Sequence, residues 1–213
     1  TQKFTVLDKE DANILSSVYR TANKNMVIIC IPYATGNVNV TINGKKEGLE
    51  LVDGIAYYNI SATDEINEIN VSYAGNTRLN PAESSKFIIM DYVVTGDTYM
   101  YYFNQADGGK IFEFIEDGTT LDFQGSIINP DQEKNVYFDV SKPVNIISTT
   151  NDAYIDLNTT AGSLMGENPG NRFTVSYGGS WSNITGINFH NTQLWVFNTH
   201  HVVLDRVSNV IED

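Results

Sequence analysis

The chain has 213 residues, of which 41% are hydrophobic, enough to bury a core in one large or two small domains. It carries 26 acidic and 13 basic side chains, and its net charge of −13 repels nucleic-acid phosphates and anionic lipid headgroups. We therefore expect no nucleic-acid binding and no membrane insertion. The lone cysteine, Cys30, excludes a disulfide within the chain and is predicted to be a small buried side chain.

Residues 1–92 are predicted to form an immunoglobulin-like β-sandwich, in which residues 1–24 are a leader segment without an assigned structure. In that leader, Ile14, Leu15 and Val18 have helical spacing, and a short helix and a strand remain alternatives. The dipeptides Asn43-Gly44 and Asp53-Gly54 favour tight hairpin turns between strands. Short strands separated by such turns are typical of a sandwich. The expected strands are 26–31, 37–43, 49–52, 55–60, 66–73 and 84–90.

Residues 93–213 are predicted to form the first coils of a right-handed parallel β-helix, so the whole chain is expected to be all-β. Residues 91–118 are rich in aromatic side chains and turn signals, and we expect them to cap the coils or to wedge between the two domains. From Thr119 the apolar segments become short, with Asn, Asp, Gly and Thr at the corners. The expected strands are 121–123, 136–140, 144–148, 153–157, 172–176, 184–189, 194–197 and 202–207.

Two of these segments can be aligned as successive repeats, 172–189 with 193–207. The alignment places Phe173 opposite Trp195 and Ile184 opposite Val202. A period near 20 residues corresponds to about one coil of a solenoid. The loop at 158–170 is then an insertion at a corner. We expect both ends of the chain to be cuts from a longer protein.

Several sequence strings resemble archaeal adhesin-like proteins, which are large surface proteins of methanogens. In the first domain they are Gly-Asn-Val-Asn-Val-Thr-Ile-Asn-Gly-Lys at 36–45, Asp-Gly-Ile-Ala at 53–56, Val-Ser-Tyr-Ala-Gly-Asn at 71–76 and Asn80-Pro81. In the second domain they are Asp-Phe-Gln-Gly at 122–125, Lys-Pro-Val-Asn-Ile-Ile-Ser at 142–148, Asn-Ile-Thr-Gly-Ile-Asn-Phe at 183–189 and Val-Val-Leu-Asp-Arg-Val-Ser at 202–208. Leu79 departs from the family, where an aromatic residue usually precedes Asn-Pro.

The resemblance implies an extracellular, cell-surface protein that is not an enzyme and that attaches to other cell surfaces or surface glycans. It provides no catalytic residues and no cofactor. The first alternative is a carbohydrate-binding or polysaccharide-degrading β-helix protein, although the chain has no adjacent Asp-Asp pair and no Gly-His-Gly. The second is a structural subunit that assembles with itself through the exposed end of the β-helix.

The candidate ligand-facing side chains are Trp181 and Trp195, which together with Tyr177 and Tyr154 are predicted to form a flat face for sugar rings. Packing of these aromatics inside the coils or over their end is the alternative. Asn158 and Asn183, each in an Asn-x-Thr triplet, are candidate glycosylation sites.

We predict no metal site. The three histidines are His190, His200 and His201, and a strand at 200–201 would point the two adjacent rings to opposite faces.

Overall fold

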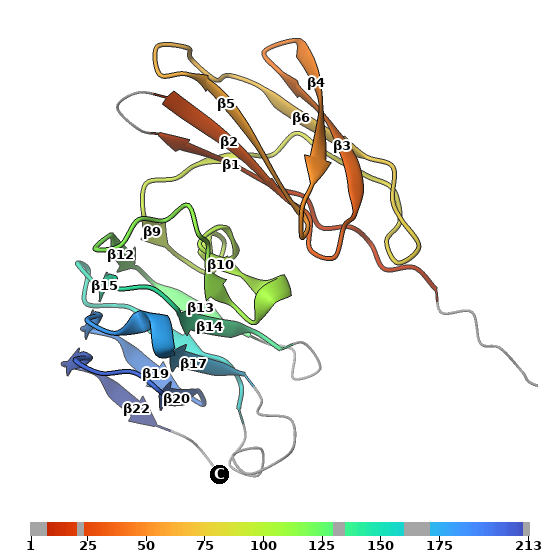
Figure 1. Cartoon of the computed structure of the whole chain (residues 1–213). Coiled ribbons are helices and arrows are strands. Elements are labelled where there is room, and N and C mark those ends of the chain that lie inside the picture. Colours follow the sequence, from red (N-terminus) through yellow and green to blue (C-terminus); the bar gives the residue numbers. More distant parts are fainter. Residues whose placement is uncertain (1–7, 21–23, 130–134, 160–170, 211–213) are drawn as a thin grey trace, which may run out of the picture. The chain divides into compact units, whose positions relative to one another are not determined.

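The computed structural model describes residues 8–20, 24–129, 135–159 and 171–210. These residues form mostly β-strands and contain no α-helix, which confirms the predicted all-β class. The chain divides into two compact units, unit 1 (Thr1–Asp91) and unit 2 (Tyr92–Asp213). This division lies one residue from the predicted domain boundary. Each unit is described by itself (Figure 1).

Unit 1 consists of two four-stranded sheets that share one apolar core. Val18, Val27 and Ile29 of the first sheet and Val40 and Val71 of the second are all at most 2% exposed within this core. The first sheet contains, in order, β5 (Ile55–Ser61), β2 (Lys24–Cys30), β1 (Leu15–Arg20) and β8 (Ile88–Ile89). The second contains β4 (Lys45–Leu51), β3 (Gly36–Ile42), β6 (Ile69–Tyr73) and β7 (Ala82–Ser84).

Part of the predicted leader belongs to this fold. Strand β1 pairs antiparallel with β2 over its whole length, so the helical alternative for this stretch is wrong. Both predicted hairpin turns form, since Asn43 and Gly44, like Asp53 and Gly54, have positive φ angles. At Gly54 a Cβ atom would lie 2.5 Å from the carbonyl oxygen of Ile31, so this turn requires glycine for space as well as for its φ of 79°.

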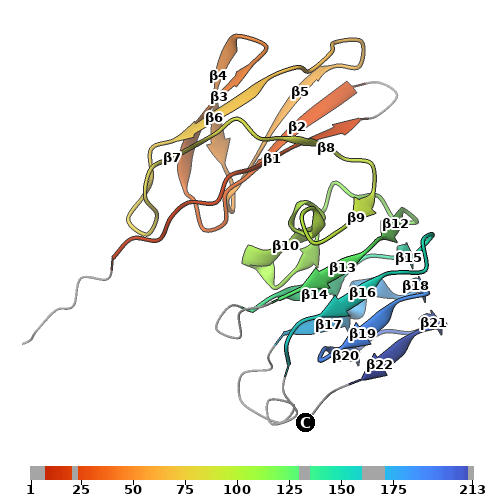
Figure 2. The ribbon, with the colours of Figure 1, turned by 180° about the vertical axis from the view of Figure 1, so that it is seen from behind.

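Unit 2 is built from three sheets. From β12 onward, successive strands of the chain belong to the three sheets in a repeating order. Figure 2 shows β12, β15, β18 and β21 stacked in one column. The β14 sheet contains β10 (Phe103–Asn104), β11 (Lys110–Ile111), β14 (Tyr137–Val140), β17 (Arg172–Val175) and β20 (Gln193–Val196). The β15 sheet contains β21 (Val203–Asp205), β18 (Asn183–Thr185), β15 (Asn145–Ile147), β12 (Thr120–Phe123) and β9 (Val93–Val94). The β16 sheet contains β13 (Ser126–Ile128), β16 (Tyr154–Asp156), β19 (Asn188–His190) and β22 (Ser208–Val210). All pairs are parallel except β10 with β11.

The interior of unit 2 is filled by side chains that lie in register from strand to strand. Leu121, Ile146, Ile184 and Leu204 are aligned across the β15 sheet, and the first three are fully buried. Leu204, in the last described strand of that sheet, is 43% exposed. A cluster of buried phenylalanine rings lies beside this column, with ring centres 4.9 to 6.4 Å apart. Its members are Phe103, Phe123, Phe138, Phe173 and Phe189.

The aromatic junction packs as the first layer of unit 2. Tyr102 and Phe103 are fully buried, and β9 and β11 extend the β15 and β14 sheets. Three short 3₁₀ turns appear in the described part of unit 2, at Tyr99–Tyr101 (η1), Gln105–Asp107 (η2) and Tyr177–Gly179 (η4).

The predicted repeat alignment is wrong by one or two residues. Phe173 lies opposite Leu194, 21 residues later, and Trp195 lies opposite Thr174. Ile184 lies opposite Leu204, 20 residues later, instead of Val202. The predicted strands at 184–189 and 202–207 are each two strands, because Gly186 (φ 75°) and Arg206 (φ 50°) turn the chain from the β15 sheet into the β16 sheet.

Candidate binding face on the β14 sheet

The outer face of the β14 sheet combines aromatic, charged and unsatisfied polar groups. Side chains alternate along a strand, so the burial of Phe138 and Val140 in the interior directs Tyr137 and Asp139 outward. The parallel register aligns the outward residues of neighbouring strands in two rows. The first row is Tyr137, Arg172 and Gln193, and the second is Lys110, Asp139, Thr174 and Trp195.

Arg172 links the aromatic side chains of this face. Its guanidinium carbon lies 5.4 Å from the ring centre of Tyr137 and 5.4 Å from that of Trp195, within the range of cation–π attraction. Trp195 keeps 38% of its surface exposed. The group therefore offers a flat apolar ring beside N–H donors, a combination that suits a sugar ring with its C–H face and hydroxyl groups.

On the same face, Oδ1 of Asp139 and Oγ1 of Thr174 lack a hydrogen-bond partner among the described residues. Both atoms are buried, and they lie on neighbouring strands. Burial raises the pKa of Asp139, against the opposing effects of a hydrogen bond from Ser176 and the positive charges of Lys110 and Arg172. A buried unsatisfied polar atom costs about 1–3 kcal/mol, so these two atoms reduce the stability of the β14 sheet.

The Asp139→Asn variant is expected to melt at a higher temperature than the parent at neutral pH. Folding raises the pKa of Asp139, so the stability that its protonated form contributes is present at acidic pH and is lost as the pH rises through the raised pKa. Asparagine resembles the protonated acid at every pH, so the gain should vanish on acidification. Thermal unfolding followed by tryptophan fluorescence at several pH values measures it.

Asp122 provides the matched control because the pKa of its carboxyl is shifted the other way. Its burial would raise the pKa, but hydrogen bonds from the hydroxyl (2.6 Å) and N–H (2.9 Å) of Thr149 and from Gln124 (2.7 Å) outweigh burial and lower it. Its stabilising contribution is present above its unfolded pKa and is lost as the pH falls through the lowered value. The Asp122→Asn variant should therefore be destabilised at neutral pH. An equal destabilisation of both variants would contradict the assignment for Asp139.

Trp181 lies at a different place, a corner of the coils between η4 and β18. It is 62% exposed, with a φ of 71°, and its ring stacks on that of His201 with centres 3.9 Å apart and planes 9° apart. His200 and His201 lie in the corner between β20 and β21, outside any strand. Their Nδ1 atoms are 2.8 Å apart. The prediction that these two rings point to opposite faces is wrong, because His201 has a left-handed backbone with φ of 56°.

The predicted flat face of four aromatics does not form. Trp195 belongs to the β14 sheet, whereas Tyr154 belongs to the β16 sheet and stacks on His190 at 5.7 Å. Nδ1 of His190 contacts Oδ2 of Asp156 at 3.0 Å. Tyr177 lies in η4 and is 82% exposed. The aromatics are therefore distributed over separate faces and corners.

The two candidate glycosylation sites have different surroundings. Asn183 is exposed on β18, and its Nδ2 donates a hydrogen bond to Oδ1 of Asn145 at 2.8 Å. Asn158 is half-buried with φ of 58°, and its N–H donates to Oδ1 of Asp156 at 2.9 Å. Most of the predicted insertion at 158–170 lies outside the described residues.

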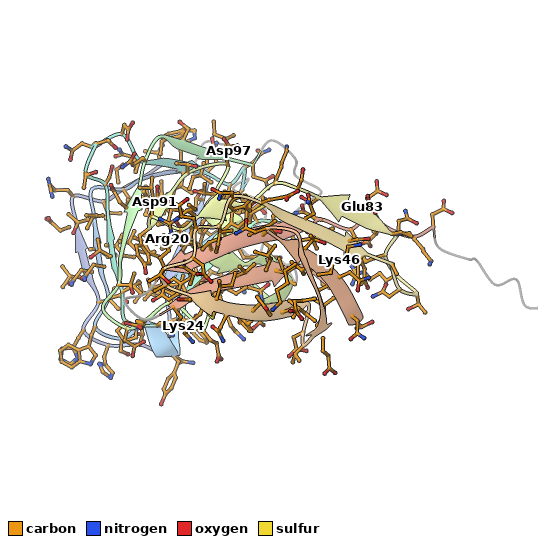
Figure 3. The ribbon with its side chains drawn as sticks, turned by 90° about the horizontal axis from the view of Figure 1, so that it is seen from above. Arg20, Lys24, Lys46, Glu83, Asp91 and Asp97 are labelled. Carbon is orange, nitrogen blue, oxygen red and sulfur yellow. The ribbon has the colours of Figure 1, made fainter. Side chains whose placement is uncertain are left out.

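Unit 1 carries a polar groove of about 700 Å³ on its second sheet. Figure 3 labels Lys46 and Glu83, which come from the edge strands β4 and β7 that border it. None of its lining residues is aromatic, so the groove provides no stacking surface.

Sequence reasoning identified Trp195 but missed Arg172, Asp139 and Thr174. These residues occupy outward positions that align from one coil to the next, and this alignment can be recognised only when the strand register is known.

Comparisons of the chain with protein families, with curated proteins and with solved structures find no match. Within residues 8–20, 24–129, 135–159 and 171–210, no three His, Cys, Asp or Glu side chains are grouped to hold a metal ion. The same residues include no helix of the length and hydrophobicity needed to cross a membrane.

Proposed function

We propose that this chain is a non-enzymatic, extracellular adhesin-like protein of a cell surface, of the archaeal type that its sequence resembles. Unit 1 would be an immunoglobulin-like sandwich, and unit 2 the opening coils of a right-handed parallel β-helix. The binding partner would be a surface glycan on the outer face of the β14 sheet. The observation that carries the proposal is Arg172 between two aromatic rings, one of which, Trp195, is 38% exposed.

The architecture supports a role in display. Two sheets whose strands pair antiparallel, except for β1 with β8, and that share one core are typical of an immunoglobulin-like sandwich. Three sheets of stacked parallel strands with an aliphatic and aromatic interior are the arrangement of a β-helix. Each coil contacts mainly the coils before and after it, which makes an extended scaffold that presents a regular outer face.

The chemistry of the β14 face favours a neutral glycan. An acidic polymer would be repelled by the net charge of −13, whereas the C–H face of a neutral sugar stacks on an aromatic ring. The hydroxyl groups of the sugar would accept hydrogen bonds from the guanidinium group of Arg172. Cleavage of a glycosidic bond requires two flanking carboxyl groups, and the second carboxyl group near Asp139, that of Asp107, is paired with Lys110 at 3.0 Å. This supports binding without hydrolysis.

The Trp195→Ala variant is expected to lose about thirtyfold in glycan affinity, which corresponds to about 2 kcal/mol for a stacking anchor. A neutral-glycan array would identify the ligand, and calorimetric titration with that glycan would measure the affinity. The Arg172→Ala variant should show a loss of the same order. The matched control is Tyr177→Ala, which removes an exposed aromatic ring in η4 and should leave affinity unchanged. Equal affinity in the parent and the Trp195→Ala variant would contradict the site, and release of reducing sugar would contradict the non-enzymatic role.

Self-assembly is the second candidate, and it is favoured by the last described coil. Leu204 continues a buried interior column yet is 43% exposed, and strands β20, β21 and β22 have no outer partner among the described residues. Further exposed apolar side chains on this coil are Val196, Phe197, Val203 and Val210. Concentration-dependent light scattering that disappears in the Leu204→Arg variant would support this role. A monomer at high concentration would count against it.

A further inference from the structure

We propose that His200 and His201 chelate a divalent transition-metal ion, with Cu²⁺ bound most tightly, through their two Nδ1 atoms. The proposal is independent of the glycan site, because the pair lies at the corner between β20 and β21, outside the β14 sheet.

The separation of the two nitrogens is close to that of two ligands on one ion. Two nitrogens each about 2.0 Å from a metal and at a right angle to one another are about 2.8 Å apart. In the structure the Nδ1 atoms are 2.8 Å apart, and the ring planes are at 90° to one another. Rotation of the two rings, so that they no longer point at one another, would direct both lone pairs at a common ion. A right angle between ligands is the preference of tetragonal Cu²⁺, which also binds nitrogen ligands most tightly among these ions.

The corner holds the pair in place before any ion binds. Trp181 stacks on the ring of His201, and its backbone N–H donates to the carbonyl oxygen of His200 at 3.2 Å. The backbone N–H of His200 donates to Oγ of Ser180 at 3.4 Å, and this hydroxyl contacts Oγ1 of Thr199 at 3.0 Å. The corner at residues 180–181 and the corner at residues 199–201 thus hydrogen-bond to each other. This contact reduces the conformational entropy lost on metal binding.

The protonation and charge of the site are compatible with a cation. A hydrogen bond between the two Nδ1 atoms requires that one ring carry its proton on Nδ1 and that the other present a lone pair there. On chelation the donor's proton moves to its own Nε2, so no net proton is released from two neutral rings. Both histidines are exposed, so water can complete the coordination, and the net charge of −13 attracts cations. His190 is held apart by Asp156 and Tyr154 on the β16 sheet.

Fluorescence provides a direct test, because the chain contains two tryptophans and Trp181 stacks on one of the ligands. In an untagged Trp195→Phe background, titration with Cu²⁺ should quench Trp181 in a saturable, one-to-one manner. His200→Ala and His201→Ala should each weaken binding at least about tenfold, since even loss of an outer-shell partner of a metal ligand costs that much. His190→Ala is the matched control and should leave the titration unchanged.

Electron paramagnetic resonance of the Cu²⁺ complex should show coupling to nitrogen nuclei, and this coupling should weaken in the His200→Ala and His201→Ala variants. Unchanged thermal unfolding of these variants would show that the loss is not caused by misfolding. Zn²⁺, which does not quench, should displace Cu²⁺ at higher concentration and restore the emission. Quenching that is identical in the parent and both single variants, or a spectrum without nitrogen coupling, would overturn the proposal.

Discussion

Replacing Phe173 by alanine is expected to destabilise unit 2 by about 3–5 kcal/mol, the cost of removing a large aromatic side chain from a well-packed core. The ring is fully buried and contacts Phe189 and Phe138, with ring centres 5.0 and 5.6 Å away. It joins neighbouring coils, because Phe138 precedes it in the β14 sheet and Leu194 follows it. The cavity would therefore remove contacts from three successive coils.

Denaturant unfolding followed by tryptophan fluorescence measures this effect selectively, because both tryptophans belong to unit 2. Tyr177→Ala is the control of similar chemistry, since this ring is 82% exposed, and its effect should stay within about 0.5 kcal/mol. Equal stability of the Phe173→Ala and Tyr177→Ala variants would show that the phenylalanine cluster is not the core of unit 2.

The Ile29→Asp substitution is expected to unfold unit 1 and to leave unit 2 folded. Ile29 is fully buried in β2, between β1 and β5, and belongs to the core shared by both sheets of unit 1. A carboxylate placed there without a partner costs several kcal/mol, a large part of the stability of a domain of this size. The phenylalanine cluster of unit 2 includes no residue of unit 1, so its cooperative transition should persist.

The expected signature is a reduced far-ultraviolet circular dichroism signal together with an unchanged tryptophan unfolding transition. Val52→Asp places the same charge at a position that is 66% exposed and should change neither signal. Loss of both transitions in the Ile29→Asp variant would mean that the two units fold as one.

The parts of the fold that depend on local chemistry could be predicted from the sequence. Asn43-Gly44 and Asp53-Gly54 require positive φ angles that few other residues adopt, so their hairpins are readable without knowledge of the rest of the chain. The strand at Leu15–Arg20 could not be assigned in this way. Its spacing fits a helix equally well, and pairing with β2 decides the outcome.

The register of the coils depends on contacts distant in sequence, and the prediction failed there. Aligning Phe173 with Trp195 matched one aromatic with another, but the interior position opposite Phe173 is occupied by Leu194. A slip of one residue exchanges the inner and outer faces of a strand, so the alignment concealed that Trp195 points outward.

The residues of the candidate binding face could not be identified from the sequence for a related reason. Its aligned residues Tyr137, Arg172 and Gln193 are separated by 35 residues in one step and by 21 in the next, because the corner loops differ in length. No fixed spacing in the sequence marks these residues as neighbours. Trp195 could be suspected only from its residue type, as an aromatic ring able to stack on a sugar.

The burial of Cys30 has a practical consequence for studying this chain. The thiol is 6% exposed in β2, and burial raises its pKa to about 12, so almost no thiolate is present at neutral pH. An alkylating reagent can therefore react with Cys30 only when the sheet around β2 opens. Because the chain has one cysteine, mass spectrometry can follow its alkylation by iodoacetamide. The alkylation rate then reports how often unit 1 opens locally around β2.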